Sequence, residues 1–287
     1  MSGDSEPAQG LVAWAGLEGR TAVVTGAAGG IGRGVALALV DVGMRVALCD
    51  RDPDGLAAVV AELTDRGSTP LAAASFDVRE ADAFGQFFAR IDDVGYVPHV
   101  LVNVVGGTFH STFLETRPRG WQALVELNFT SVLTACHLAG SRMADEGRGS
   151  IVNITTIEAH RGAPGYAVYA GLKSAVEGFG RSLAVELGPR GVRVNCVAPD
   201  YLLTPGTEHL EREQGRDPIG PEEARAIVPL GRLARPHDVA GSVVFLASDL
   251  SAMVTGQTLH PDGGALAAGR WSRYGDDWVP RLPSHLG

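Results

Sequence analysis

The sequence predicts an α/β protein with a three-layer, doubly wound fold, in which helices cover both faces of a single parallel seven-stranded sheet. Two observations lead to this fold class. Short apolar segments alternate along the chain with longer segments of helical periodicity, which is the order that right-handed βαβ crossovers produce. The short segments are also almost continuously apolar, as strands that are buried on both faces must be.

The predicted strands are short runs rich in branched and small apolar residues. They cover residues 22–24, 45–49, 71–76, 99–105, 151–155, 192–197 and 257–260. The segments between them repeat apolar residues every three or four positions, which predicts helices at 35–39, 56–63, 84–91, 121–143, 167–187 and 237–247. The pattern is clearest at Phe84, Phe87, Phe88 and Ile91, which would form one buried helix face. The segment 121–143 is predicted as one long helix.

This regular pattern defines one domain over residues 20–264. Residues 1–19 precede it and are predicted to form a flexible leader. Residues 201–228 are long, charged and rich in proline and glycine, and such a connection inside a compact domain is typical of a substrate lid. Residues 265–287 form a C-terminal extension.

Both end segments carry large apolar side chains that are costly to leave in water. We therefore expect these side chains to pack on the domain or, in the C-terminal extension, on the domain or on another subunit. They are Leu11, Val12 and Trp14 in the leader and Trp271, Tyr274 and Trp278 in the extension.

Composition excludes several classes of function. The chain has 287 residues, 45% of them hydrophobic, and a net charge of -9, which disfavours nucleic acid or an acidic membrane surface as a partner. Residues 1–10 are acidic and polar, unlike a secretory signal, and no apolar run reaches membrane-spanning length. These features predict a soluble, cytoplasmic protein.

Metal and thiol chemistry are also not expected. The eight histidines are scattered without ligand spacing, so we predict no metal site. Cys49, Cys136 and Cys196 form no CxxC motif, and we interpret them as small buried apolar residues in a reducing compartment.

A glycine cluster joins the first predicted strand to the first helix. Residues 25–32 read TGAAGGIG, and glycines at such a turn let backbone amides and a helix N-terminus approach a pyrophosphate. Asp50 ends the second strand, 18 residues after Gly32, where a carboxylate can accept both hydroxyls of an adenosine ribose and repel a 2′-phosphate. The alternative is an Asp that only initiates the following turn. Arg51 could soften this discrimination, but Gly29 offers no basic side chain to hold a 2′-phosphate, so NAD is preferred and NADP is less favoured.

Tyr169 and Lys173 lie four residues apart on a predicted helix and therefore share one face. Lys173 is the only lysine among the 24 lysine and arginine residues of the chain. A lysine ammonium is a compact charge that can lose its proton, whereas an arginine guanidinium cannot. Such a charge would stabilise the phenolate of Tyr169 and lower its pKa. The pair is thus predicted to handle a proton.

Together these motifs resemble those of the short-chain dehydrogenase/reductase family, a family with the Rossmann fold, over residues 21–264. The family's glycine motif matches Gly26, Gly30 and Gly32, and its YxxxK motif matches Tyr169 and Lys173. Further similar features, in the same order as in the family, are Asp77-Val78, Asn128, Val254-Thr255-Gly256-Gln257 and Asp262-Gly263-Gly264.

The resemblance implies an oxidoreductase that transfers a hydride between NAD(H) and a secondary alcohol, diol or ketone. Tyr169 would be the general acid/base, Lys173 would lower its pKa and hold the nicotinamide ribose, and Asn128 would anchor a water. Thr156 stands where the family has a serine, and its hydroxyl would donate to the substrate oxygen. The implied cofactor contacts are Gly26, Gly30, Ile31, Gly32, Asp50, Arg51, Asp77, Val78, Asn103, Gly106, Tyr169, Lys173, Pro199 and Thr204.

The sequence departs from the family at other places. The family's NNAG motif is replaced by residues 103–106, which read NVVG, so the polar contacts of the second asparagine are absent. Asp200 replaces the usual glycine and would either lie close to the nicotinamide or cap a turn. Glu158, His160 and Arg161 follow Thr156 and would face either solvent or the substrate, in which case His160 and Arg161 could receive a carboxylate.

The resemblance also implies a small-molecule substrate and a homotetramer assembled through the long helices that contain Asn128 and Tyr169 and through the last helix and strand. Two other functions stay open. One is an NADPH-dependent ketoreductase of a biosynthetic pathway, and the other is a cofactor-sensing regulator without turnover.

Overall fold

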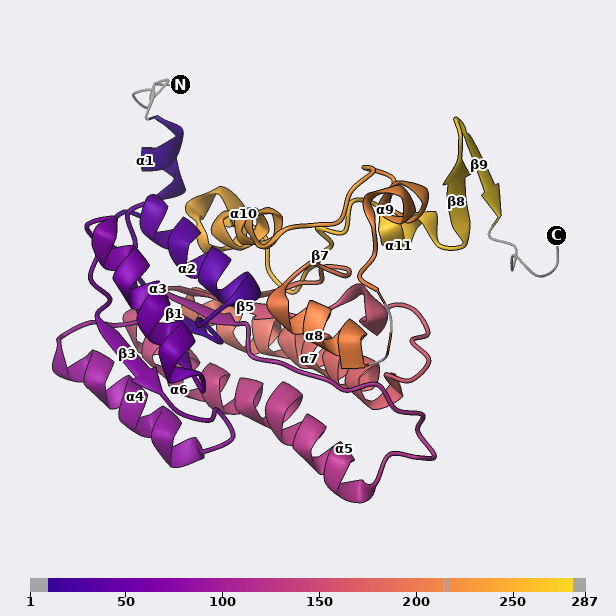
Figure 1. Cartoon of the computed structure of the whole chain (residues 1–287). Coiled ribbons are helices and arrows are strands. Elements are labelled where there is room, and N and C mark those ends of the chain that lie inside the picture. The colour runs from indigo at the N-terminus through magenta and orange to yellow at the C-terminus, as the bar shows by residue number, and fades with distance from the viewer. Residues whose placement is uncertain (1–9, 214, 216, 281–287) are drawn as a thin grey trace.

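Seven parallel strands in the order β3-β2-β1-β4-β5-β6-β7 form the central sheet of the computed structural model, which describes residues 10–213, 215 and 217–280 (Figure 1). The predicted doubly wound fold class is confirmed. The strands are β1 (Thr21–Thr25), β2 (Arg45–Asp50), β3 (Ala72–Ser75), β4 (Val100–Asn103), β5 (Gly149–Ile154), β6 (Val192–Val197) and β7 (Thr258–Leu259).

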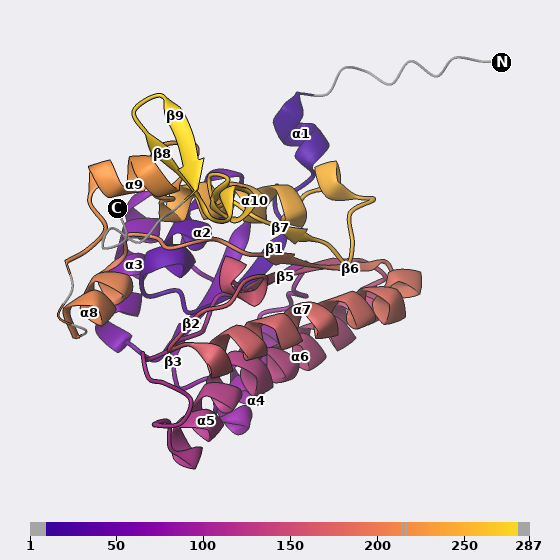
Figure 2. The ribbon, with the colours of Figure 1, turned by 90° about the vertical axis from the view of Figure 1, so that its right-hand side faces the viewer.

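Helices cover both faces of this sheet and create two separate layers of core (Figure 2). On one face lie α2 (Gly30–Asp41), α3 (Pro53–Asp65) and α10 (Pro236–Ala247). On the other lie α4 (Ala81–Asp93), α5 (Pro118–Val125), α6 (Ser131–Glu146) and α7 (Ala167–Leu187). Successive side chains of β1 point into opposite core layers: Val24 packs in the layer with α2, and Val23 packs in the layer with α4 and α6. This burial on both faces explains why the strands read as continuous apolar runs.

The strand order reverses between β1 and β4, since the chain runs outward from β1 to β2 and β3 and then returns to β4 on the other side of β1. In doubly wound sheets such a reversal opens a crevice at the carboxyl ends of the strands, where ligands bind. The loops after β1, β2, β4, β5 and β6 all emerge at this edge.

The predicted single helix over 121–143 is wrong in one respect. Residues 118–146 are helical throughout, but a π-helical turn, Glu126–Thr130, separates α5 from α6. A π-turn holds one more residue than an α-turn and commonly marks a functional site. Apolar spacing does not reveal one extra residue within a helix, so the sequence pattern missed this turn.

The predicted lid region, residues 201–228, contains α8 (Pro205–Glu213) and α9 (Pro221–Ile227). Each helix starts at a proline, which is favoured at the first helical position because its fixed φ suits the helix and its missing N–H is not needed there. These prolines were the sequence signal for the two helices. Leu202 also forms a β-bridge to Ala234, which ties the start of this region to the segment before α10.

The N-terminal segment is attached to the domain at Leu17, which is only 1% exposed, after the short helix α1 (Leu11–Ala15). The expectation that Trp14 docks is wrong, because 62% of this side chain is exposed. Residues 1–9 and the side chains of Leu11 and Val12 lie outside the described residues.

The C-terminal extension forms α11 (Ala265–Ala268) and a hairpin of β8 (Trp271–Tyr274) and β9 (Asp277–Pro280), which lies beside α9 at the edge of the molecule (Figure 1). Its aromatic residues do not pack closely on the domain, which was one of the two expectations, and packing on another subunit stays a prediction. Trp271 and Trp278 stay almost half exposed, and Tyr274 is 81% exposed.

Candidate active site

The loop between β1 and α2 has the tight backbone that its glycines predicted. Gly26 and Gly30 have φ values of 69° and 50°, in the left-handed region that favours glycine. At Gly32 an added Cβ would lie 1.9 Å from the carbonyl oxygen of Gly26, so the first turn of α2 can approach the loop only if this residue lacks a side chain. The loop therefore presents backbone amides at a helix N-terminus, which suits a phosphate.

A cleft of about 610 Å³ lies over this loop at the carboxyl edge of the sheet. Nine of the residues predicted to contact the cofactor line it: Gly26, Gly30, Ile31, Asp50, Arg51, Asp77, Val78, Gly106 and Thr204. Sequence reasoning missed the others: Ala28, Gly29, Asp52, Phe76, Val104, Val105, Gly107, Leu127, Leu202, Gly206 and Thr207. Most of these residues are neighbours in sequence of predicted residues. Extending each motif to the whole loop that contains it would therefore have found them.

Asp50 is held at one end of the cleft by backbone donors. Its Oδ2 accepts a hydrogen bond of 2.9 Å from the amide of Ala28 in the glycine loop, and its Oδ1 accepts one of 3.0 Å from the amide of Asp52. The carboxylate therefore links the loop after β1 to the end of β2. This position suits recognition of ribose hydroxyls at the entrance of a cofactor cleft.

Asp77 contributes a second carboxylate to the cleft, but this one is paired. Both of its oxygens accept hydrogen bonds from the guanidinium of Arg79, which lowers the pKa of Asp77 to about 2. Val78 beside it is 5% exposed and belongs to the core cluster on the α4 side. The pair thus offers one charged rim residue and one apolar wall to a ligand.

Five residues predicted to contact the cofactor do not line the cleft: Gly32, Asn103, Tyr169, Lys173 and Pro199. Asn103 is 3% exposed, and its amide donates a 2.9 Å hydrogen bond to Asn153 on β5, because the side chain at the end of β4 points into the core. Gly32 allows the close packing described above. The carbonyl of Pro199 accepts a 3.0 Å hydrogen bond from the amide of Ile157 and so joins the loops after β5 and β6.

Tyr169 and Lys173 lie one turn apart near the start of α7, with the ammonium 5.8 Å from the centre of the phenol ring. Lys173 is 3% exposed, and its Nζ donates a 2.9 Å hydrogen bond to the carbonyl oxygen of Ile154. Burial lowers the pKa of Lys173 to about 8. Burial, with a smaller contribution from Glu158, raises the pKa of Tyr169 to about 12. The expected lowering of the Tyr169 pKa is thus not produced by these surroundings, because desolvation of the buried phenol and the charge of Glu158 both raise it.

Asn128 sits in the π-turn and is fully buried. Its amide donates hydrogen bonds to the carbonyls of Gly107 at 2.9 Å and Leu124 at 3.0 Å, while its Oδ1 accepts one of 3.2 Å from the amide of Gly107. A Cβ at Gly106 would lie 2.9 Å from Lys173 Nζ and 3.0 Å from Asn128 Oδ1. The glycine therefore leaves room for these two polar groups to converge on one place beside the cleft.

Thr156 follows the end of β5 and is nearly buried, with 9% exposed. Its Oγ1 accepts a hydrogen bond of 3.3 Å from the amide of Glu158. Because this bond uses only a lone pair, the hydroxyl proton can still be donated to a bound molecule. The threonine thus keeps the donor that was expected of the family's serine.

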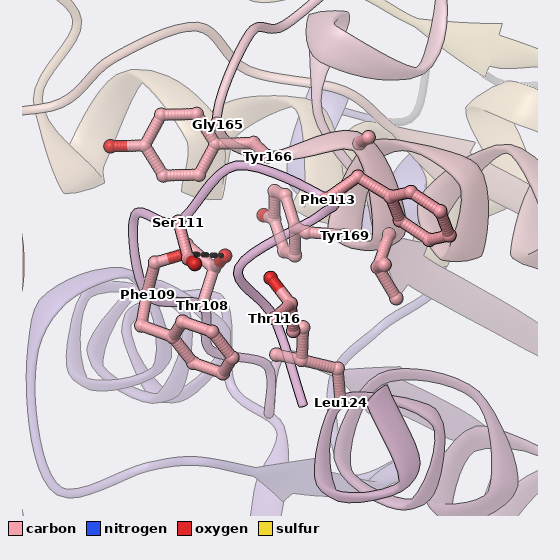
Figure 3. A pocket seen from close by; sticks show the side chains of 11 residues that line it. Thr108, Phe109, Ser111, Phe113, Thr116, Leu124, Gly165, Tyr166 and Tyr169 are labelled. Carbon is pink, nitrogen blue, oxygen red and sulfur yellow. Dashed lines mark hydrogen bonds between the residues drawn. The ribbon is translucent and has the colours of Figure 1, made fainter. Parts of the chain in front are cut away.

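A narrow pocket adjoins Tyr169 and is formed by the loop after β4 and the loop before α7 (Figure 3). Its lining includes hydroxyl groups and apolar side chains: Thr108, Phe109, Ser111, Phe113, Thr116, Leu124, Gly165, Tyr166, Ala167, Val168 and Tyr169. The two loops are joined by a 3.0 Å hydrogen bond from the amide of Ser111 to the carbonyl of Gly165. None of these contacts except Tyr169 was predicted from the sequence.

Arg161 forms ion pairs with carboxylates of the protein itself and is not free to receive the carboxylate of a substrate. Its guanidinium lies 2.7 Å from Glu158 and 3.1 Å from Asp200, and so it bridges the loops after β5 and β6. Burial raises the pKa of Asp200. Two carboxylates around one guanidinium leave little net positive charge, which disfavours Arg161 as a binding site for an acidic substrate.

Two further properties bear on function. Among the described residues, no group of three or more His, Cys, Asp or Glu side chains is arranged to hold a metal ion. Across the same described ranges, no helix combines the length and apolar character that a bilayer-spanning segment needs.

Comparisons with known proteins agree on the kind of chemistry. A family model described as enoyl-(acyl carrier protein) reductase matches residues 26–265. The 3-oxoacyl-(acyl-carrier-protein) reductase of Synechocystis sp. is 38% identical over 257 residues, covering 86% of this chain and 97% of that protein. The D-threitol dehydrogenase of Mycolicibacterium smegmatis is 35% identical over 254 residues, covering 86% and 93%. A crystal structure of gluconate 5-dehydrogenase from Burkholderia cenocepacia with NADP and tartrate is similar with a TM-score of 0.80 and 28% identity, covering 88% and 96%.

Proposed function

The chain belongs to the short-chain dehydrogenase/reductase family of oxidoreductases, and on this basis we propose that it transfers a hydride between NAD(H) and a secondary alcohol, a diol or the corresponding ketone. The observation that carries the proposal is the arrangement of Tyr169 and Lys173. Their side chains face each other beside a glycine-lined cleft, and Gly106 lets Lys173 and Asn128 converge there.

The residues of the cleft fit a nicotinamide dinucleotide. The backbone amides of the glycine loop suit the pyrophosphate, and the carboxylate of Asp50 suits the adenosine ribose. Lys173 does not line the cleft itself, but its ammonium borders Gly106, which does, and so suits the second ribose. A bound nicotinamide supplies the hydride chemistry. The protein's own part is to bind both reactants in one orientation and to manage a proton.

In the proposed mechanism Thr156 donates a hydrogen bond to the substrate oxygen and orients it toward Tyr169. In alcohol oxidation Tyr169 removes the hydroxyl proton, and in ketone reduction it returns that proton. Burial favours the protonated phenol, whose pKa is about 12, so a phenolate must be stabilised by the ammonium of Lys173. Asn128, whose Oδ1 borders Gly106 as Lys173 Nζ does, then anchors a water that passes the proton outward.

We favour NAD over NADP because Asp50 lies at the ribose end of the cleft, where a carboxylate repels a 2′-phosphate. The second candidate is an NADPH-dependent ketoreductase. Arg51 also lines that end and could pair with a phosphate, and the gluconate 5-dehydrogenase relative was crystallised with NADP. The 3-oxoacyl-(acyl-carrier-protein) reductase relative supports the same alternative. A regulator without turnover is disfavoured, because it would not need Tyr169 and Lys173 in contact.

We further propose that the protein is a cytoplasmic homotetramer. The three buried, free cysteines support a reducing compartment. A hollow of about 420 Å³ between α6 and α7, lined in part by Leu133, Phe179 and Leu183, supports a subunit contact along these helices. Light scattering tests the assembly, and a monomeric mass would contradict it.

The decisive experiment is a panel of secondary alcohols, diols and the matching ketones, each assayed with NAD(H) and NADP(H) by the absorbance of the reduced nicotinamide. We expect turnover with NAD and at least one alcohol, and loss of that turnover in Tyr169→Phe with retained cofactor binding. Binding of NAD without turnover on any member of the panel would favour the regulator. Higher catalytic efficiency with NADPH would favour the ketoreductase.

A further inference from the structure

Glu177 is a buried carboxylate on α7, one helical turn after Lys173, and it has no part in the mechanism above. It is 4% exposed. A buried carboxylate is costly unless hydrogen-bond donors surround it, so the groups that donate to Glu177 are tied closely to its position. Its hydrogen-bond partners Thr155 and His160 lie in the loop that contains Thr156.

The first partner is Thr155, whose hydroxyl donates a 2.9 Å hydrogen bond to Oε1 of Glu177. Thr155 is itself 3% exposed and immediately precedes Thr156. The Glu177 carboxylate is therefore hydrogen-bonded to Thr155, whose backbone position helps to fix the direction of the Thr156 side chain.

The second partner is His160, whose Nε2 lies 3.1 Å from both oxygens of the Glu177 carboxylate. An ionised carboxylate only accepts hydrogen bonds, so Nε2 must carry the proton and donate it. His160 also packs edge to face against His260, which follows β7, with 4.7 Å between the ring centres. Burial, and then the charge of His160, lowers the pKa of His260, which favours a neutral second ring here.

A third contact closes the loop on the helix, because the hydroxyl of Ser174 on α7 donates a 2.9 Å hydrogen bond to the carbonyl of Ala159. Residues 155–160 are thus bound to α7 at Thr155, Ala159 and His160, and two of these three attachments go to one carboxylate. The same stretch of α7 carries Tyr169 and Lys173.

We propose that Glu177 is a positioning residue that holds the catalytic loop, residues 155–160, in register with α7. Its carboxylate sets the distance of Thr156 from Tyr169 and Lys173 through Thr155 and His160. The proposal rests on the proposed function, in which Thr156 orients the substrate oxygen. Small displacements of a donor cost catalysis far more than binding, because the transition state tolerates less misalignment than the bound cofactor does.

The sharpest test compares two substitutions of Thr155. Thr155→Val keeps the volume but removes the donor to Glu177, whereas Thr155→Ser keeps the donor. We expect kcat to fall about tenfold or more in Thr155→Val and to stay near the wild-type value in Thr155→Ser. The dissociation constant of NADH, measured by fluorescence, should change less than about twofold in both variants, because Thr155 does not line the cofactor cleft.

The carboxylate is tested by Glu177→Gln and Glu177→Ala. The glutamine carbonyl can still accept the Thr155 hydrogen bond, so we expect Glu177→Gln to keep most of the wild-type turnover. In Glu177→Ala we expect kcat to fall as far as in Thr155→Val. The double variant Thr155→Val/Glu177→Ala should be little worse than either single variant, as expected of two ends of one contact. Glu186→Gln, an exposed glutamate on the same helix, is the matched control.

Unchanged kcat in both Thr155→Val and Glu177→Ala, with an active wild-type enzyme, would overturn the positioning role and leave the proposed function intact. Equal losses of kcat and of NADH binding would also overturn it, since they indicate a general structural role. If the wild-type protein binds NADH but turns over no substrate, the proposed function fails instead.

Discussion

Lys173 donates a 2.9 Å hydrogen bond from its ammonium to the carbonyl oxygen of Ile154, the residue with which β5 ends. This bond fixes the only lysine of the chain between the catalytic loop and the helix that carries Tyr169. It leaves two ammonium protons for other acceptors. The geometry therefore depends on a compact cation in a narrow space.

Lys173→Arg is expected to lower kcat by about 100-fold or more. The planar guanidinium is too large for the space beside Gly106, which Lys173 Nζ and Asn128 Oδ1 both border, and it cannot deprotonate. Steady-state kinetics measure the effect, with the exposed Arg181→Lys on the same helix as the control. Wild-type turnover in Lys173→Arg would remove the ammonium from the mechanism.

The burial of Lys173 predicts a pH dependence of stability. Its pKa falls from 10.5 to about 8 on folding, so between these pH values the unfolded chain binds more protons, and stability rises with pH. Below pH 8 the cost of the buried ammonium is fully present, roughly 3 kcal/mol, and it disappears as the pH approaches 10.5. The free energy of unfolding, measured with denaturant, should therefore rise with pH over this window in the wild type relative to Lys173→Met. Parallel curves would contradict the prediction.

Thr156→Ala should lose most of the turnover, about 100-fold, while the affinity for NADH stays the same. In the proposed mechanism the hydroxyl donates to the substrate oxygen, but the side chain does not line the cofactor cleft. Thr156→Ser restores the family's own residue and should remain active. Turnover and NADH fluorescence titration separate the two effects, and an active Thr156→Ala would exclude this side chain from catalysis.

Asp50→Asn tests the choice of cofactor. The substitution removes the charge that repels a 2′-phosphate, so the ratio of kcat/KM for NAD to that for NADP should fall about tenfold or more. Asp54→Asn changes an exposed carboxylate in the first turn of α3 and should leave the ratio unchanged. If both variants behave alike, Asp50 does not discriminate between the cofactors.

Gly32→Ala is expected to destabilise the fold by about 3 kcal/mol, since its Cβ would lie 1.9 Å from the backbone oxygen of Gly26. Gly171→Ala, at an exposed helical position with no atom within 4 Å of the added Cβ, should instead be neutral or slightly stabilising. Thermal unfolding of the two variants provides the comparison. Equal melting temperatures would show that the loop rearranges around the methyl group.

The sheet and its helices were predictable because their signals are strong and local. The predicted segments 192–197 and 167–187 coincide with β6 and α7, since dense apolar runs and long amphipathic periods determine these elements. The glycine loop and the spacing of Tyr169 and Lys173 were equally readable, because short motifs fix their geometry.

What the sequence did not reveal depends on the direction of side chains and on contacts between distant segments. Asn103 lies at the correct strand end but points into the core, a choice set by its partner Asn153 on the neighbouring strand. The pocket beside Tyr169 needs two loops to meet, which no local pattern encodes. The interaction of Glu177 with Thr155 and His160 likewise joins a helix to a loop that precedes it by many residues.

The π-turn at Glu126–Thr130 gives Asn128 an unusual dependence on chain length. Each residue advances an α-helix by about 100°, so removing one residue from this turn would restore a regular helix and swing Asn128 away from Gly107. The helix itself would survive such a deletion. The proposed role of Asn128 therefore depends on the length of this helix to within one residue, a property that a substitution on its surface would not reveal.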